Sequence, residues 1–105
     1  MSYKLKFLPS ALREWRKLAP EIKEQFKLHL SHRLENPHID NARIRGYKHH
    51  YKIKIRAAGY RLIYEVEEKA ITVYVICVGR RDTIYKILKK RKPKITDGQP
   101  APNFK

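Results

Sequence analysis

The fold is decided by residues 50–78, HYKIKIRAAGYRLIYEVEEKAITVYVICV, because this stretch predicts three consecutive strands. Apolar and polar residues alternate over residues 50–56 and again over 60–67, which is the pattern of a half-buried strand. Residues 70–78 are almost wholly apolar, as is typical of a central strand covered on both faces. We therefore expect a sheet in which two amphipathic strands lead into a buried one.

The register of the first two strands decides which charged residues gather on one face. A slip of one residue would turn every side chain over, so the two apolar faces must meet. A two-residue turn at Ala58-Gly59 achieves this, although Ala is not a favoured first residue of such a turn. The expected register places Arg56 opposite Arg61, Lys54 opposite Ile63 and Lys52 opposite Glu65. Four cations then share a face, with only Glu65 and Glu67 to compensate them.

This basic face has two interpretations. Alternating lysines are common where a strand simply meets water, and the strand pattern alone favours that interpretation. The positions of further residues favour a functional cluster instead. Arg80 and Arg81 directly follow the central strand, and Tyr85 lies one helical turn beyond. Several cations and a phenol would then converge without enough carboxylates to neutralise them.

The rest of the chain predicts helices around this sheet. Residues 3–7 alternate as a strand, Ser10 is a fair N-cap for a first helix, and Pro20 opens a second helix that ends at Asn36-Pro37. The two helices are joined tightly enough to form an antiparallel hairpin. Gly79 is expected to end the central strand, and Asp82 is expected to cap a short helix after it.

These elements predict one domain over residues 1–90 and a flexible basic tail over 91–105. The fold class is α+β: a small antiparallel sheet of about four strands, packed on an N-terminal helical hairpin, with a short C-terminal helix. The apolar runs are shorter than the ~20 residues of a membrane helix. The single cysteine, Cys77, lies in an apolar run and reads as a core residue, which suits a reducing cytoplasm.

Charge predicts the partner. The chain has 25 Lys and Arg against 10 Asp and Glu, for a formal net charge of +15. Such an excess repels itself in a compact fold, so we expect a polyanion, with nucleic acid as the leading candidate. An acidic protein partner fits the same surface. The basic residues are not arrayed on one amphipathic helix, which argues against a membrane.

The chemistry available to this chain points to RNA. The sequence has no metal-ligand spacing, no glycine-rich phosphate loop and no serine or cysteine nucleophile with a convincing base, so no metal or cofactor is expected. Only His49 and His50, of the five histidines, begin the basic strand. RNA supplies its own nucleophile, the 2′-hydroxyl, and fixed cations stabilise the charge that builds at phosphorus. A lysine crowded by cations, or Tyr85 in the same field, could accept the proton.

At this point the chain resembles a known family, the RelE-type mRNA interferases of the RelE/ParE toxin superfamily. The matching segments are residues 11–18 (ALREWRKL), 51–56 (YKIKIR), 59–64 (GYRLIY) and 78–81 (VGRR), followed by Tyr85. The similarity runs from about residue 2 to 88 and implies the microbial-RNase-like RelE fold. It also implies a toxin that cleaves mRNA in the ribosomal A site by metal-independent attack of the 2′-hydroxyl.

The resemblance assigns roles to individual residues. Lys52 and Lys54 would act as base or charge stabilisers, Arg61 would stabilise the transition state, and Arg81 would contact the phosphate or assist the leaving group. Tyr85 would stack on the nucleotide. Arg45, Arg56 and Arg80 would be RNA contacts. The stretch from Arg81 to Tyr85 is about two residues shorter than in well-known relatives, and the tail is longer.

The resemblance also implies partners: a cognate acidic antitoxin that displaces the last helix, the 70S ribosome with mRNA in its A site, and operator DNA bound through the antitoxin complex. Two other functions would suit a related fold, a ParE-like toxin that targets gyrase and a non-enzymatic basic RNA-binding module. The lysine–arginine–tyrosine set favours the nuclease, because ParE-like members generally lack it.

Overall fold

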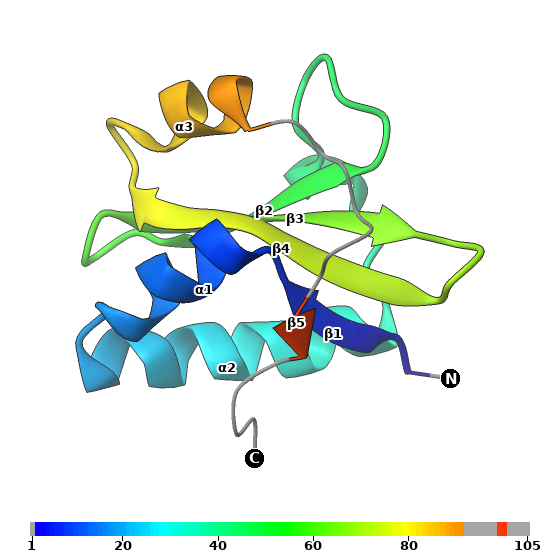
Figure 1. Cartoon of the computed structure of the whole chain (residues 1–105), viewed down its shortest axis with the longest axis horizontal. Coiled ribbons are helices and arrows are strands. Elements are labelled where there is room, and N and C mark those ends of the chain that lie inside the picture. Colours follow the sequence, from blue (N-terminus) through cyan, green and yellow to red (C-terminus); the bar gives the residue numbers. More distant parts are fainter. Residues whose placement is uncertain (1, 92–98, 101–105) are drawn as a thin grey trace.

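A computed structural model describes residues 2–91 and 99–100. Its elements in chain order are β1 (Lys4–Phe7), α1 (Pro9–Arg16), α2 (Pro20–Glu35), a 3-10 turn η1 (Asp40–Ala42), β2 (His50–Ile55), β3 (Tyr60–Glu67), β4 (Thr72–Arg80), α3 (Ile84–Lys90) and the two-residue β5 (Gln99–Pro100). Helices α1 and α2 lie against one face of the sheet, and α3 lies over the other (Figure 1). The expected α+β class, with its helical hairpin and short last helix, is confirmed.

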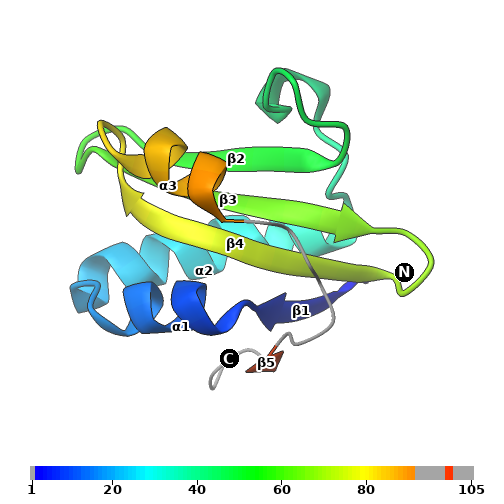
Figure 2. The same cartoon turned by 45° about the horizontal axis from the view of Figure 1, so that its top comes forward.

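The sheet has the strand order β2-β3-β4-β1-β5, with β2 at one edge (Figure 2). Strands β2, β3 and β4 form an antiparallel meander, whereas β1 runs parallel to β4. The sheet is therefore mixed, and the expectation of a sheet that is antiparallel throughout is corrected by β1. The direction of β1 could not be predicted from a turn, because the helical hairpin and two strands separate it from β4 in the chain.

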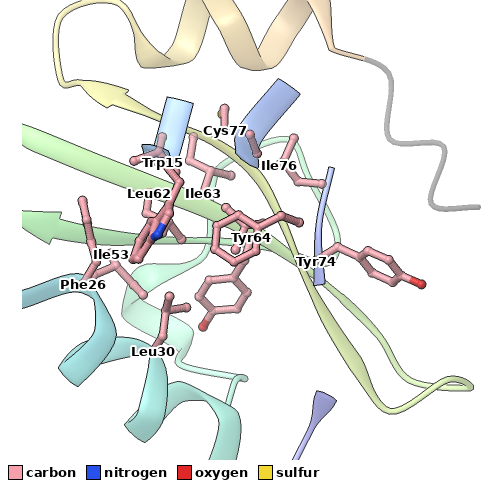
Figure 3. Close-up of a cluster of buried hydrophobic side chains, with 14 of the residues drawn as sticks. Trp15, Phe26, Leu30, Ile53, Leu62, Ile63, Tyr64, Tyr74, Ile76 and Cys77 are labelled. Carbon is pink, nitrogen blue, oxygen red and sulfur yellow. The ribbon is translucent and has the colours of Figure 1, made fainter. Parts of the chain in front are cut away.

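The main core lies between the sheet and the helical hairpin. Trp15, Phe26 and Leu30 from the helices meet Leu62 and Tyr64 from β3 (Figure 3). The buried hydroxyl of Tyr64 donates a hydrogen bond to the carbonyl of Pro37 at 2.7 Å. Because a buried hydroxyl without a partner costs stability, this bond lets a tyrosine occupy the core.

A second, smaller apolar layer holds α3 on the opposite face. Ile84 and Leu88 of α3 are buried, as are Ile63 of β3 and Cys77 of β4, which stand in register with each other. A Cβ at Gly79 would lie 3.6 Å from the Ile84 side chain, an ordinary contact, so α3 approaches β4 closely here. Cys77 is buried, which confirms its expected place in the core, and burial raises the pKa of its thiol to about 12.

The β2–β3 register differs from the expected one by two residues. Ile55 pairs with Tyr60, Lys54 with Arg61, Lys52 with Ile63 and His50 with Glu65. The loop spans four residues, Arg56 to Gly59, and is closed by a hydrogen bond from Gly59 N to Arg56 O at 3.1 Å. Gly59 has a φ of +69°, which suits the end of such a loop. Because a shift of two keeps each side chain on its face, the predicted faces are right and the opposing pairs are wrong.

Some predicted boundaries are also corrected. Leu8 takes the N-cap position of α1 because Pro9, with its fixed φ, occupies the first turn, so Ser10 lies inside the helix. Thr83, not Asp82, stands at the N-cap of α3. Gly79 does not break β4, which continues to Arg80.

The first residue of the predicted flexible tail, Arg91, is held in place by hydrogen bonds to Glu14. Gln99–Pro100 pairs with β1. Residues 92–98 and 101–105 lie outside the described residues, so the flexibility of the tail stays a prediction. None of the helices in the described part of the chain is long and apolar enough to cross a membrane.

Candidate active site

The basic face of β2 and β3 is built around a direct pairing of Lys54 with Arg61. Arg61 is held toward α3, where its Nη1 donates a hydrogen bond to the Tyr85 hydroxyl at 3.0 Å. Its guanidinium carbon also lies 5.7 Å from the centre of the Tyr85 ring, within the range of a cation–π contact. The α3 helix therefore fixes a phenol beside two cations of the sheet.

Arg81 joins this group through the turn that follows β4. Its backbone N–H donates to the carbonyl of Gly59 at 2.9 Å, which ties that turn to the β2–β3 loop. Lys54, Arg61 and Arg81 then border one small hollow, together with Arg56. We call this the catalytic hollow, after the role that the sequence leads us to expect of its residues. Sequence reasoning placed these cations on a common face, and the structure brings them together.

Lys52 extends the same face toward the start of β2. Burial lowers the pKa of its ammonium, and the charges of Lys54, Arg61 and Arg33 lower it further. Two of these cations were expected from the strand pattern, whereas Arg33 comes from α2. A lowered pKa makes the neutral amine, which can accept a proton, more accessible near neutral pH.

The negative charges that were expected to compensate this face lie elsewhere. Glu65 pairs in register with His50, at the far end of β2, instead of with Lys52. Burial raises the pKa of Glu65 to about 7, with a further contribution from Glu67, so its carboxyl is largely protonated below neutral pH. Within the described residues, the lining of the catalytic hollow includes no carboxylate. The cations there are free to meet an anion.

The three predicted RNA contacts are placed differently from one another. Arg56 lies in the β2–β3 loop and borders the catalytic hollow. Arg80 stands in register with Tyr60 and lies 5.6 Å over its ring, on the opposite face of the sheet from Arg61, and it borders a neighbouring hollow with Arg81. Arg45 is exposed in the turn before β2, and none of the contacts seen in the described chain joins it to the cluster.

Comparisons with known proteins identify the family. The family model for the ParE toxin of the type II toxin–antitoxin system parDE matches residues 5–85. The chain is 46% identical over 82 residues to the mRNA interferase toxin RelE of Escherichia coli strain K12, which covers 78% of this chain and 86% of the relative. The chain belongs to the RelE-type toxins.

Solved structures agree with this membership. A free-state arginine variant of the E. coli toxin RelE superposes with a TM-score of 0.81 at 40% identity, covering 90% of this chain and 99% of that one. RelE in the intact E. coli RelBE toxin–antitoxin complex superposes with a TM-score of 0.74 at 46% identity, covering 75% and 96%. This RelE-type toxin therefore shares both the sequence and the architecture of the family.

Sequence reasoning missed two features of this toxin's surface. His50, which begins the basic strand, is only 5% exposed and its ring packs on Tyr47 with centroids 4.7 Å apart, so it cannot contact a substrate directly. Arg33 of α2 reaches the cluster from another element. The only signal for Arg33 in the sequence is its helical spacing from His29, which shares its side of α2.

Proposed function

We propose that this RelE-type toxin is an mRNA interferase that cuts messenger RNA in the ribosomal A site without a metal ion. Its relative at 46% identity carries the name mRNA interferase toxin. The observation that carries the proposal is the catalytic hollow, in which Lys54, Arg61 and Arg81 converge beside Tyr85 with no carboxylate in the described lining. Such a surface is suited to a phosphodiester.

The proposed chemistry is an internal transfer at phosphorus. The 2′-oxygen of the RNA attacks the adjacent phosphorus, its proton passes to a base, and the bond to the 5′-oxygen breaks as that oxygen gains a proton. The products are a 2′,3′-cyclic phosphate and a 5′-hydroxyl. Lys52, whose pKa is lowered by burial and by neighbouring cations, is the proposed base.

The remaining residues stabilise charge and hold the substrate. Arg61, Arg81 and Lys54 would face the non-bridging oxygens, where negative charge grows in the transition state. The hydrogen bond from Arg61 fixes the ring of Tyr85, which can then stack on a base. Arg56, Arg80 and Arg45 remain proposed contacts to the RNA backbone.

The proposed partners follow from the family and the charge. An antitoxin would bind the toxin, as one does in the E. coli RelBE toxin–antitoxin complex, and the net charge of +15 favours an acidic one. The ribosome would present the mRNA, and operator DNA would be bound through the antitoxin complex. All of these partners meet in the cytoplasm, where we place this toxin.

The decisive experiment is primer extension on mRNA in stalled 70S ribosomes, with free RNA alongside. Wild type should cut at the A-site codon, whereas Arg81→Ala and Lys54→Ala should each cut about 10²–10³ times more slowly. Arg16→Ala, which removes an exposed cation from α1, is the matched control and should cut normally. A 2′-deoxy nucleotide before the cut should abolish cleavage.

The metal-independent step has its own readout. A phosphorothioate at the scissile phosphate should slow cleavage. Cd²⁺ should not restore the rate, since no metal would contact the substituted oxygen. Rescue by Cd²⁺ would contradict the metal-free step while leaving the interferase in place. Absence of any cutting by folded, growth-inhibiting wild type would overturn the proposal and direct attention to gyrase supercoiling, the activity of a ParE-like toxin.

A further inference from the structure

A second hollow lies beside the catalytic one, at the outer edge of the sheet. Strand β2 is the edge strand (Figure 2), and Arg33 of α2 hydrogen-bonds to the carbonyl of Lys52 in it. The polar residues that line this hollow are His29, Arg33, Asn41, Lys52, Lys54 and Arg56. We call it the edge hollow. It shares Lys54 and Arg56 with the catalytic hollow, so the two form one continuous surface.

Arg33 is fixed at the base of the edge hollow. Its Nη1 donates hydrogen bonds to the carbonyl of Lys52 at 3.2 Å and to the hydroxyl of Tyr64 at 2.9 Å. The guanidinium carbon also lies 5.8 Å from the centre of the Tyr64 ring. These partners are neutral, so they orient the guanidinium without cancelling its charge. A planar, oriented guanidinium is the preferred protein group for binding phosphate.

The edge hollow concentrates positive charge. Two arginines and two lysines line it, with His29 beside them, and the lining found in the described chain includes no carboxylate. Arg33 contributes to lowered pKa values in two of its neighbours. The pKa of His29 is lowered by burial and then by Arg33, and the pKa of Lys52 is lowered by burial and by cations that include Arg33. Uncompensated cations held this close destabilise a fold unless an anion joins them.

We infer that the edge hollow binds a second phosphate of the RNA strand, next to the one in the catalytic hollow, with Arg33 as its anchor. This inference rests on the proposed function, since it continues the path of the same substrate. The shared residues Lys54 and Arg56 carry one backbone from the catalytic hollow across the edge of β2. Asn41, from η1, offers an uncharged donor at the rim.

The test is binding of a short, fluorescein-labelled RNA with 2′-O-methyl groups throughout, which cannot be cleaved. Anisotropy is measured between about 50 and 200 mM KCl for Arg33→Gln, Asn41→Asp and Arg16→Gln, each of which lowers the net charge by one. Arg33→Gln should weaken binding about tenfold at low salt and reduce the slope of log affinity against log salt by about 0.7. Asn41→Asp should weaken binding to a similar degree, and Arg16→Gln should stay within about twofold of wild type.

The variants separate a binding role from a structural one. Arg33→Gln removes two hydrogen bonds, so its thermal unfolding is measured alongside, whereas Asn41→Asp leaves both bonds in place. Equal affinities and equal salt slopes for all three variants, or no binding by wild type, would overturn the inference. Equal, Arg33-dependent binding of a polyglutamate of matched charge would also overturn it and assign the hollow to an acidic protein.

The outcome is independent of the ribosome assay. If wild type cuts mRNA but the three variants bind alike, the proposed phosphate site in the edge hollow is contradicted and the proposed interferase activity is not. If wild type does not cut mRNA, and Arg33→Gln and Asn41→Asp lose affinity for RNA, the interferase activity is contradicted and the phosphate site is supported.

Discussion

His50 and Glu65 face each other across β2 and β3 without a hydrogen bond. Their closest atoms, Nε2 of His50 and Oε1 of Glu65, are 3.8 Å apart, and within the described residues neither atom has another partner. Burial lowers the pKa of His50 to about 4, with His49 adding to the effect, and burial raises the pKa of Glu65 to about 7. Although the spacing would suit an ion pair, desolvation favours two neutral groups between these pKa values.

This pair predicts how stability depends on pH. The folded pKa of Glu65 lies above its ordinary value of 4.5, so its contribution is lost as pH rises through about 7. The folded pKa of His50 lies below its ordinary 6.5, so its contribution is lost as pH falls toward 4. As pH rises from about 5 to 8, the free energy of unfolding of Glu65→Gln should therefore increase relative to that of wild type, by up to roughly 3 kcal/mol.

Urea unfolding at several pH values measures this difference. Glu35→Gln, which replaces an exposed carboxylate at the end of α2, is the control and should track wild type at every pH. A stability difference between Glu65→Gln and wild type that is the same at both ends of the range would show that Glu65 keeps its charge in the fold.

At the scale of elements, the stretch of β4 that extends beyond its pairing with β1 is covered by side chains from α1 and from the end of α3. Beyond its pairing with β1, the Val78 N–H donates to Oε1 of Glu14 at 3.0 Å, and Nη1 of Arg91 donates to the Ile76 carbonyl at 2.8 Å. Arg91 also holds the Glu14 carboxylate through both terminal nitrogens, which raises the pKa of Arg91. An unpaired strand edge is thereby satisfied by side chains.

We call the contacts of Arg91 with Glu14 and Ile76 the clamp, and we expect α3 to become more mobile when they are removed. Arg91→Met should destabilise the fold by about 1–3 kcal/mol, because it leaves a partly buried carboxylate and a strand carbonyl without their donor. Hydrogen exchange should accelerate over residues 76–90. Lys90→Met, an exposed neighbour, is the control. In a double-mutant cycle, a coupling energy near zero between Arg91→Met and Glu14→Gln would contradict the clamp.

The elements themselves could be predicted from the sequence, and their relations only in part. Apolar periodicity located the helices and the three meander strands, because it reports which face each element buries. It also placed Lys52, Lys54 and Arg61 on one face. It did not fix the opposing pairs, because a shift of two residues leaves every face unchanged. Arg33 and Glu14 act across the chain on other elements, and no local pattern marks such contacts.

At the scale of the whole molecule, the charge excess is a long-range property. The molecule measures 33 × 31 × 27 Å, while the Debye length is about 30 Å at 0.01 M salt and about 10 Å at 0.1 M. At low salt nearly every cation therefore repels every other, whereas at moderate salt only neighbours do. Burial lowers the pKa values of Lys52 and His29, and neighbouring cations lower them further, which is the local sign of this repulsion.

The free toxin should therefore become more stable as salt is added. We expect its melting temperature to rise by several degrees between about 0.01 and 0.3 M KCl, because a gain of about 1 kcal/mol shifts a domain of this size by roughly 4–8 °C. The control is the double variant Lys4→Glu/Lys48→Glu, which exchanges two exposed cations for anions and lowers the net charge by four, from +15 to +11. Its melting temperature should respond less to salt than that of wild type. A response that is flat, or equal in both proteins, would mean that solvent already screens the charges. Any binding of anions by the two hollows would then depend on local geometry instead of the field of the whole molecule.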